Sequence, residues 1–373
     1  MSVSAIQTAK VIRSAAGMSV PPIPAPAVVF TNGLLDQDFA KTCHGLLRGS
    51  ARFSPVAVLD SRFAGRDAGE VMDGQKRDVP VVASLDDYLC GGSERPRFFV
   101  VGVAFSGGRL PDPCRSEIIG ALDLGMTVVC GLHQLLGDDA EFLEAATRGG
   151  GEIVDIRRPR DTSELRFWTG EAREIGASVL GVLGTDCAVG KRTTARFLWE
   201  AAVRSGIKAE MIYTGQTGWM QGYPHGFLFD ATLNDFVSGE LERVILECVS
   251  DRDPDLIIIE GQGALRNPSG PCGSEIMLSG NARKIVLQHA PGRTHFVDHE
   301  EIDLGLPTPQ DEMALIRAYG SDVIAVTLNG EGLSGEELRE YQLKLAAQVT
   351  VPVVRPLEEG VDAVVPAMLE YAR

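Results

Sequence analysis

The sequence lacks the features that mark membrane-spanning and secreted proteins. No apolar stretch is long enough to span a bilayer, and the apolar N-terminal segment is interrupted by Lys10 and Arg13. We therefore expect neither a transmembrane helix nor a secretory signal. Residues 1–27 are interpreted as a tail or dimerisation arm that ends in the proline-rich stretch "PPIPAP".

Closely spaced cysteines are also missing. The chain has 7 cysteines, scattered without a Cys-x-x-Cys pair. Structural zinc sites and disulfide frameworks depend on closely spaced or paired cysteines. We therefore expect no metal site and no disulfide bonds, and reduced thiols of this kind are typical of a cytoplasmic protein.

Basic residues are fewer than acidic ones. The chain has 35 lysines and arginines against 51 aspartates and glutamates, which gives a net charge of −16. Such a field repels polyanions. We expect no nucleic-acid or membrane partner, and any anionic ligand requires a local basic pocket.

Short apolar runs alternate with helical patterns in both halves of the 373-residue chain. This alternation predicts an α/β fold class with parallel sheets covered by helices. We predict a Rossmann-like domain over 28–160, a charged crossing near 155–175 and a second α/β domain over 170–373. The first half lacks G-x-G-x-x-G spacing, which favours a scaffold or subunit-contact role over a dinucleotide site; Asp60, at a strand end, is its one candidate ligand residue.

The second domain opens with a glycine-rich turn between a strand and a helix. The stretch "GTDCAVGK" ends in Lys191, and this arrangement is typical of P-loops, whose backbone N–H groups surround phosphate oxygens. The expected contacts of the phosphates are Gly184, Thr185, Ala188, Val189, Gly190, Lys191, Arg192 and Thr193.

Arg192 occupies a position that is a hydroxyl residue in nucleotide hydrolases and kinases. That hydroxyl binds the magnesium ion that neutralises the phosphates. Arginine cannot bind a cation, and it adds a second positive charge instead. The loop is thus suited to a diphosphate held without metal, unless Thr193 or Thr194 restores the magnesium contact in a shifted register.

The loop "GTD-x-x-VGK", the strand "LIIIEGQGAL" and the late strand "VIAVTLN" resemble dethiobiotin synthetase. The resemblance implies a nucleotide-binding parallel domain in which Asn329 faces the base. The lysine of that enzyme's substrate-side strand is missing from "IYTGQTGW". Carboxylation of a diamine is therefore not supported.

A closer resemblance extends over nearly the whole chain. The motifs "GTDCAVGKRTT", "YTGQTGWMQG", "IIIEGQGAL" and "LQHAPGR" are similar to those of a two-domain family long of unknown function, which includes D-glutamate N-acetyltransferases. The resemblance implies acetyl-CoA as co-substrate and N-acetyl-D-glutamate as product. Coenzyme A carries a diphosphate that is not cleaved, which suits a loop without a magnesium-binding hydroxyl.

Acetyl transfer to an amine requires a base that removes the ammonium proton. Glu260, at the end of an apolar strand, is the first candidate, followed by Asp186 in the loop and by His289. The alternative for Glu260 is a carboxylate linked to magnesium.

The acceptor requires groups that bind its carboxylates. We predict Arg266 and Arg293 for this role, together with Gln216 and Thr217 in "TGQTGWMQGYPHG". That segment is interpreted as a lid over the thioester or as a subunit interface.

The sequence therefore favours acetyl-CoA-dependent N-acetylation of an acidic amino acid, D-glutamate, by a homo-oligomer. Two alternatives stay open: a Mg-ATP-dependent kinase or ligase of the dethiobiotin synthetase type, and a non-catalytic nucleotide-responsive switch.

Overall fold

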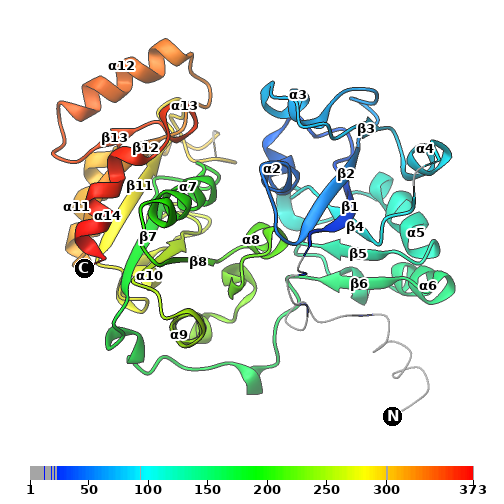
Figure 1. Ribbon diagram of the computed structural model, residues 1–373, viewed down its shortest axis with the longest axis horizontal. Coiled ribbons are helices and arrows are strands. Elements are labelled where there is room, and N and C mark those ends of the chain that lie inside the picture. The colour runs from blue at the N-terminus through cyan, green and yellow to red at the C-terminus, as the bar shows by residue number, and fades with distance from the viewer. Residues whose placement is uncertain are drawn as a thin grey trace. The chain divides into compact units, whose positions relative to one another are not determined.

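The computed structural model describes residues 12, 18, 21, 23–92, 94–299 and 301–372 (Figure 1). The predicted tail over 1–27 lies almost wholly outside these residues. The chain divides into two compact units: an N-terminal unit of residues 1–159 and 216–224, and a P-loop unit of residues 160–215 and 225–373. Both have parallel sheets, which confirms the predicted α/β fold class.

The N-terminal unit contains a six-stranded sheet in the order β3-β2-β1-β4-β5-β6. All its pairings are parallel. This strand order is that of the dinucleotide-binding Rossmann fold, so the predicted Rossmann-like half is confirmed. The strands are β1 (Ala25–Phe30), β2 (Phe53–Leu59), β3 (Val81–Val82), β4 (Phe98–Val101), β5 (Thr127–Cys130) and β6 (Glu152–Asp155).

The connections between these strands are helical. The main helices are α2 (Lys41–Leu47), α3 (Ala68–Asp73), α4 (Leu85–Cys90), α5 (Arg115–Asp123) and α6 (Ala140–Gly149). Asp60, after β2, is buried and accepts hydrogen bonds from the Thr31 hydroxyl (2.7 Å) and the Leu35 backbone N–H (3.1 Å). It therefore fixes the turn after β1, and its contacts give no support to the predicted role in ligand binding.

A short helix from the second half of the sequence completes the N-terminal unit. All six residues of α8 (Gln216–Gln221) are buried, and the Gln221 amide donates to the carbonyls of Gly45 (2.9 Å) and Gly49 (3.1 Å). The Arg52 guanidinium lies 4.0 Å from the centre of the Trp219 ring. Within the segment expected to be a lid or subunit interface, α8 is thus packed into this unit, and both expectations stay predictions.

The P-loop unit contains a seven-stranded sheet in the order β13-β12-β11-β7-β10-β8-β9, again parallel throughout. The strands are β7 (Ser178–Gly184), β8 (Ala209–Tyr213), β9 (His225–Gly226), β10 (Leu256–Glu260), β11 (Lys284–His289), β12 (Asp322–Leu328) and β13 (Val353–Val354). The helices are α7 (Lys191–Arg204), α9 (Asn234–Arg252), α10 (Ser274–Leu278), α11 (Pro309–Ala318), α12 (Gly335–Ala346), α13 (Pro356–Glu359) and α14 (Val365–Tyr371).

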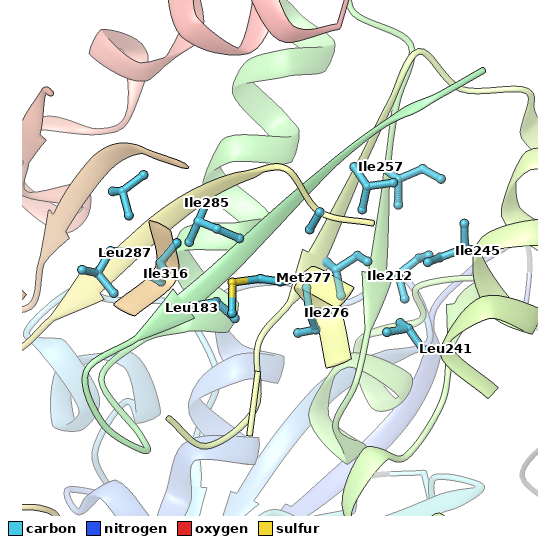
Figure 2. Close-up of a cluster of buried hydrophobic side chains, with 14 of the residues drawn as sticks. Leu183, Ile212, Leu241, Ile245, Ile257, Ile276, Met277, Ile285, Leu287 and Ile316 are labelled. Atoms are coloured by element: carbon cyan, nitrogen blue, oxygen red, sulfur yellow. The ribbon is translucent and has the colours of Figure 1, made fainter. Parts of the chain in front are cut away.

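An apolar cluster packs one face of this sheet against helices (Figure 2). Burial of such side chains is worth roughly 25 cal/mol per Å² of apolar surface. Because it fixes β7, β10 and β11 side by side, their carboxyl ends meet at one edge of the sheet. The labelled members are Leu183, Ile212, Leu241, Ile245, Ile257, Ile276, Met277, Ile285, Leu287 and Ile316.

The segment that follows residue 159 is fastened to α9 by two buried glutamates. Glu242 accepts hydrogen bonds from the backbone N–H groups of Thr169 (2.6 Å), Gly170 (2.8 Å) and Ala172 (3.1 Å). Glu240 pairs with Arg160 at 2.7 Å. The predicted crossing is therefore an ordered part of the P-loop unit from Arg160 onwards.

No helix within the described ranges combines the length and the apolar character needed to cross a membrane.

Trp219→Ala is expected to destabilise the N-terminal unit by about 3–5 kcal/mol, because it leaves a large cavity under Arg52. Hydrogen exchange measured by mass spectrometry should show faster exchange in β1, β2 and α2, with β7 and β10 unchanged. Trp168→Ala is the control, since Trp168 is partly exposed in the other unit. Unchanged protection of β1 and β2 in Trp219→Ala would contradict the placement of α8.

Candidate functional site

The phosphate loop occupies the turn between β7 and α7. Its backbone enters the left-handed region at Ala188 (φ 54°) and at Gly190 (φ 102°). Backbone N–H groups in such conformations form concave anion-binding turns. The Thr185 N–H is used by the sheet, since it donates to the Gln288 carbonyl at 3.0 Å. The predicted strand–turn–helix arrangement of a P-loop is present.

Lys191, the first residue of α7, is 7% exposed. Its ammonium group donates to the carbonyls of Asp186 and Gly263, both at 2.7 Å. Burial lowers the pKa of Lys191, and nearby acidic groups, among them Asp186 and Glu260, act in the opposite direction. The lysine therefore links the phosphate loop to the loop after β10.

Asp186 is fully buried within the phosphate loop and accepts four hydrogen bonds. The donors are the Cys187 N–H (2.7 Å), the Asn267 side-chain amide (2.9 Å), the Arg293 guanidinium (3.2 Å) and the Val297 N–H (2.8 Å). These bonds use both oxygens of the carboxylate. We infer that Asp186 organises the site, and its predicted role as a base stays a prediction.

Arg293 also makes several hydrogen bonds within the site. Its guanidinium donates to Glu331 (2.6 Å), to Asp186 and to the Cys187 carbonyl (2.8 Å). Its side chain is only 10% exposed. These contacts favour a clamp between the phosphate loop and the loop after β12 over the predicted contact with a substrate carboxylate.

His289, the last residue of β11, has partners on both ring nitrogens. Nδ1 lies 2.9 Å from the Thr185 hydroxyl and Nε2 lies 3.1 Å from the Tyr341 hydroxyl. Burial lowers its pKa to about 4. A ring that is both occupied and weakly basic is suited to positioning Thr185, and its geometry gives no support to the predicted catalytic role.

Glu260 ends β10 and is buried at the same edge of the sheet. The Thr214 N–H lies 3.4 Å from Oε2, and the Thr214 hydroxyl donates to the Glu260 carbonyl at 2.8 Å. Gln262 packs against Gly215, because a Cβ there would lie 2.7 Å from Gln262 Nε2 and 4.0 Å from Glu260 Oε1. The predicted role of Glu260 as a base stays a prediction.

The two threonines that follow Arg192 differ in burial and in hydrogen bonding. Thr194 is buried and donates to Gln288 Oε1 at 2.6 Å. A hydroxyl that donates one hydrogen bond keeps its lone pairs, so this bond is compatible with a magnesium contact through Thr194, and Thr193 is half-buried. Asn329 lies beside the loop and donates to the Val189 carbonyl at 3.1 Å.

Arg266 lies in the loop after β10 and is held by a buried carboxylate. Its Nε donates to Glu312 Oε1 at 2.6 Å, and its side chain is 40% exposed. Burial raises the pKa of Glu312, and the ion pair with Arg266 opposes that shift. The pair orients Arg266 while part of its guanidinium stays accessible, as binding of a carboxylate requires.

Gln216 and Thr217 lie in α8 of the N-terminal unit. Gln216 Oε1 accepts from Arg157 at 2.8 Å, and the Thr217 hydroxyl lies 2.9 Å from that of Thr42. The predicted contact of these two residues with substrate stays a prediction. Sequence reasoning overlooked Asn267, Gln288 and Glu312, because each acts through partners distant in the sequence; Gln288 lies in the motif "LQHAPGR", but the motif does not show what its side chain contacts.

The two halves of the chain match the two domains of one family. Residues 166–365 match the P-loop domain of DUF1611, a domain of unknown function, and residues 61–159 match its N-terminal Rossmann-like domain. The chain belongs to the DUF1611 family. A solved structure of a DUF1611 family protein from Anabaena variabilis has a TM-score of 0.84 and 27% identity, over 93% of this chain and 99% of that one.

Two proteins of similar sequence have a named activity. The chain is 31% identical over 272 residues to a D-glutamate N-acetyltransferase of a Pseudoalteromonas species, and 30% identical over 278 residues to one of Tritonibacter scottomollicae. Each alignment covers 72% of this chain and 80% of the relative. These findings support an acetyltransferase function and agree with the family resemblance inferred from the motifs.

The buried His289 predicts a pH dependence of stability. Its pKa is about 4 in the folded chain against an ordinary 6.5. The unfolded state therefore binds the proton more readily, and stability is lost as the pH falls from 6.5 towards 4, by up to about 3 kcal/mol. His289→Gln should flatten this part of the curve of denaturant midpoint against pH. Equal slopes in the two proteins between pH 7 and 5 would contradict it.

Proposed function

We propose that this chain transfers the acetyl group of acetyl-CoA to the amino group of an acidic amino acid, with D-glutamate as the acceptor. The observation that carries the proposal is the similarity to two D-glutamate N-acetyltransferases, which extends over 80% of each. The contacts at the phosphate loop support it independently.

The loop is suited to a diphosphate that stays intact. Lys191 now donates to two carbonyls, and a phosphate oxygen would give it a stronger, charge-assisted hydrogen bond. Arg192 adds a second cation on the first turn of α7, and the Thr194 hydroxyl is engaged by Gln288. In a chain with a net charge of −16, this local basic pocket is what an anionic cofactor requires.

Glu260 is the base in this proposal. It accepts one proton from the ammonium group of the acceptor, and the amine then attacks the thioester carbonyl carbon. The new C–N bond forms while the C–S bond breaks, and coenzyme A leaves as a thiolate that takes up the second amine proton. Asp186 and His289 are engaged in holding the loop, so neither competes for this role.

Arg266 binds a carboxylate of the acceptor. Its guanidinium is oriented by Glu312, and the fork geometry of arginine matches a carboxylate in a bidentate manner. An acidic amino acid supplies such a group beyond its reacting amine.

The purified protein, incubated with D-glutamate and acetyl-CoA in excess EDTA, should release free thiol and form N-acetylglutamate, because no step requires a metal ion. L-glutamate and D-alanine serve as comparison acceptors. Absence of thiol release together with magnesium-dependent formation of ADP from ATP would overturn the proposal in favour of a kinase or ligase.

Glu260→Gln should lower kcat by roughly 10²–10⁴-fold, the usual contribution of a general base, and leave the KM for acetyl-CoA nearly unchanged. Glu340→Gln on the exposed face of α12 is the control and should change neither constant. Steady-state kinetics with D-glutamate make the comparison. Wild-type kcat in Glu260→Gln would exclude Glu260 as the base.

A further inference from the structure

Gln288 is a buried amide at the edge of the phosphate loop. It is the penultimate residue of β11, lies opposite Gly184 in the parallel pairing with β7, and is 2% exposed. Its backbone carbonyl holds the first N–H of the loop, that of Thr185. The backbone of Gln288 is therefore held in place by the sheet and by the first residue of the loop.

The orientation of the Gln288 amide is set by two hydroxyl groups. Thr194 of α7 and Thr327 of β12 both donate to Oε1. The hydrogen-bond network places the amide oxygen toward these two hydroxyls. The nitrogen must then point to the opposite side.

That opposite side is the phosphate loop. A Cβ placed on Gly190 would lie 3.8 Å from Gln288 Nε2 and 3.8 Å from Asn329 Nδ2, with nothing nearer. Within the described ranges, no group accepts a hydrogen bond from Gln288 Nε2. Asn329 uses its amide for one bond, to the Val189 carbonyl. Two amide nitrogens thus converge above Gly190, where a side chain is absent.

We propose that Gln288, together with Asn329, donates hydrogen bonds to a phosphate oxygen above Gly190 and thereby selects a metal-free diphosphate over a magnesium–nucleotide complex. The chemistry follows from the donor set: a magnesium ion requires oxygen ligands, whereas N–H groups offer none and favour bare phosphate oxygens. Thr194 and Thr327 are positioning residues, because they act through the Gln288 oxygen. This inference rests on the proposed function in that an anion occupies the loop.

The test uses the full-length chain and isothermal titration calorimetry. Gln288→Glu keeps an oxygen for the Thr194 and Thr327 hydroxyls and replaces the amide nitrogen by a charged oxygen. The control is Gln348→Glu, which adds the same charge on the exposed surface and keeps an acceptor for Gln310. Coenzyme A and inorganic pyrophosphate in EDTA are the probes, followed by ADP with and without magnesium.

Gln288→Glu should weaken coenzyme A and pyrophosphate in EDTA by roughly tenfold to a hundredfold, since a carboxylate beside a phosphate is repulsive. Gln348→Glu should bind like the wild type. Magnesium should raise the ADP affinity of Gln288→Glu more than that of the wild type, because the new carboxylate adds an oxygen ligand for the ion.

A second variant keeps the inference testable if Gln288→Glu does not fold. Thr327→Val removes one of the two hydroxyls that orient the amide, and it should weaken coenzyme A by a smaller factor that Thr327→Ser restores. Wild-type affinity for coenzyme A in both Gln288→Glu and Thr327→Val would overturn the inference and leave the proposed function intact. Failure of the wild type to bind coenzyme A or pyrophosphate in EDTA would instead overturn the proposed function.

Discussion

The site depends on the buried carboxylate of Asp186. Its four donors come from the phosphate loop itself, from Asn267 after β10 and from Arg293 and Val297 after β11. A buried charge is tolerated only when such partners replace its lost hydration. The same bonds therefore hold three loops in register and fix the concave backbone of the phosphate loop.

Around this acidic centre, the surfaces that face an incoming ligand are donors. Lys191, the amide of Gln288 and the amide of Asn329 present N–H groups, and Arg192 follows on the first turn of α7. Donors of this kind favour an anion. Under the proposed function, they hold the diphosphate of coenzyme A.

The sequence predicted the elements whose signals are local. Alternating apolar runs predicted the parallel sheets, and the glycine-rich turn before Lys191 predicted the start of α7. The helix α8 was missed because six residues show no periodicity, and its helical state depends on tertiary contacts with α2.

Within the site, the sequence located the residues but not their partners. Asp186 accepts hydrogen bonds from groups 81 to 111 positions away in the sequence. A short sequence motif cannot show which distant groups will reach it. A carboxylate in a loop can be a base or a clamp, and the number of N–H groups that reach it decides between the two. Asp186, Glu240 and Glu242 each bind a coil segment through several donors and belong to the second kind. Glu260 ends β10 at the same edge of the sheet, and its role as the base belongs to the proposed function.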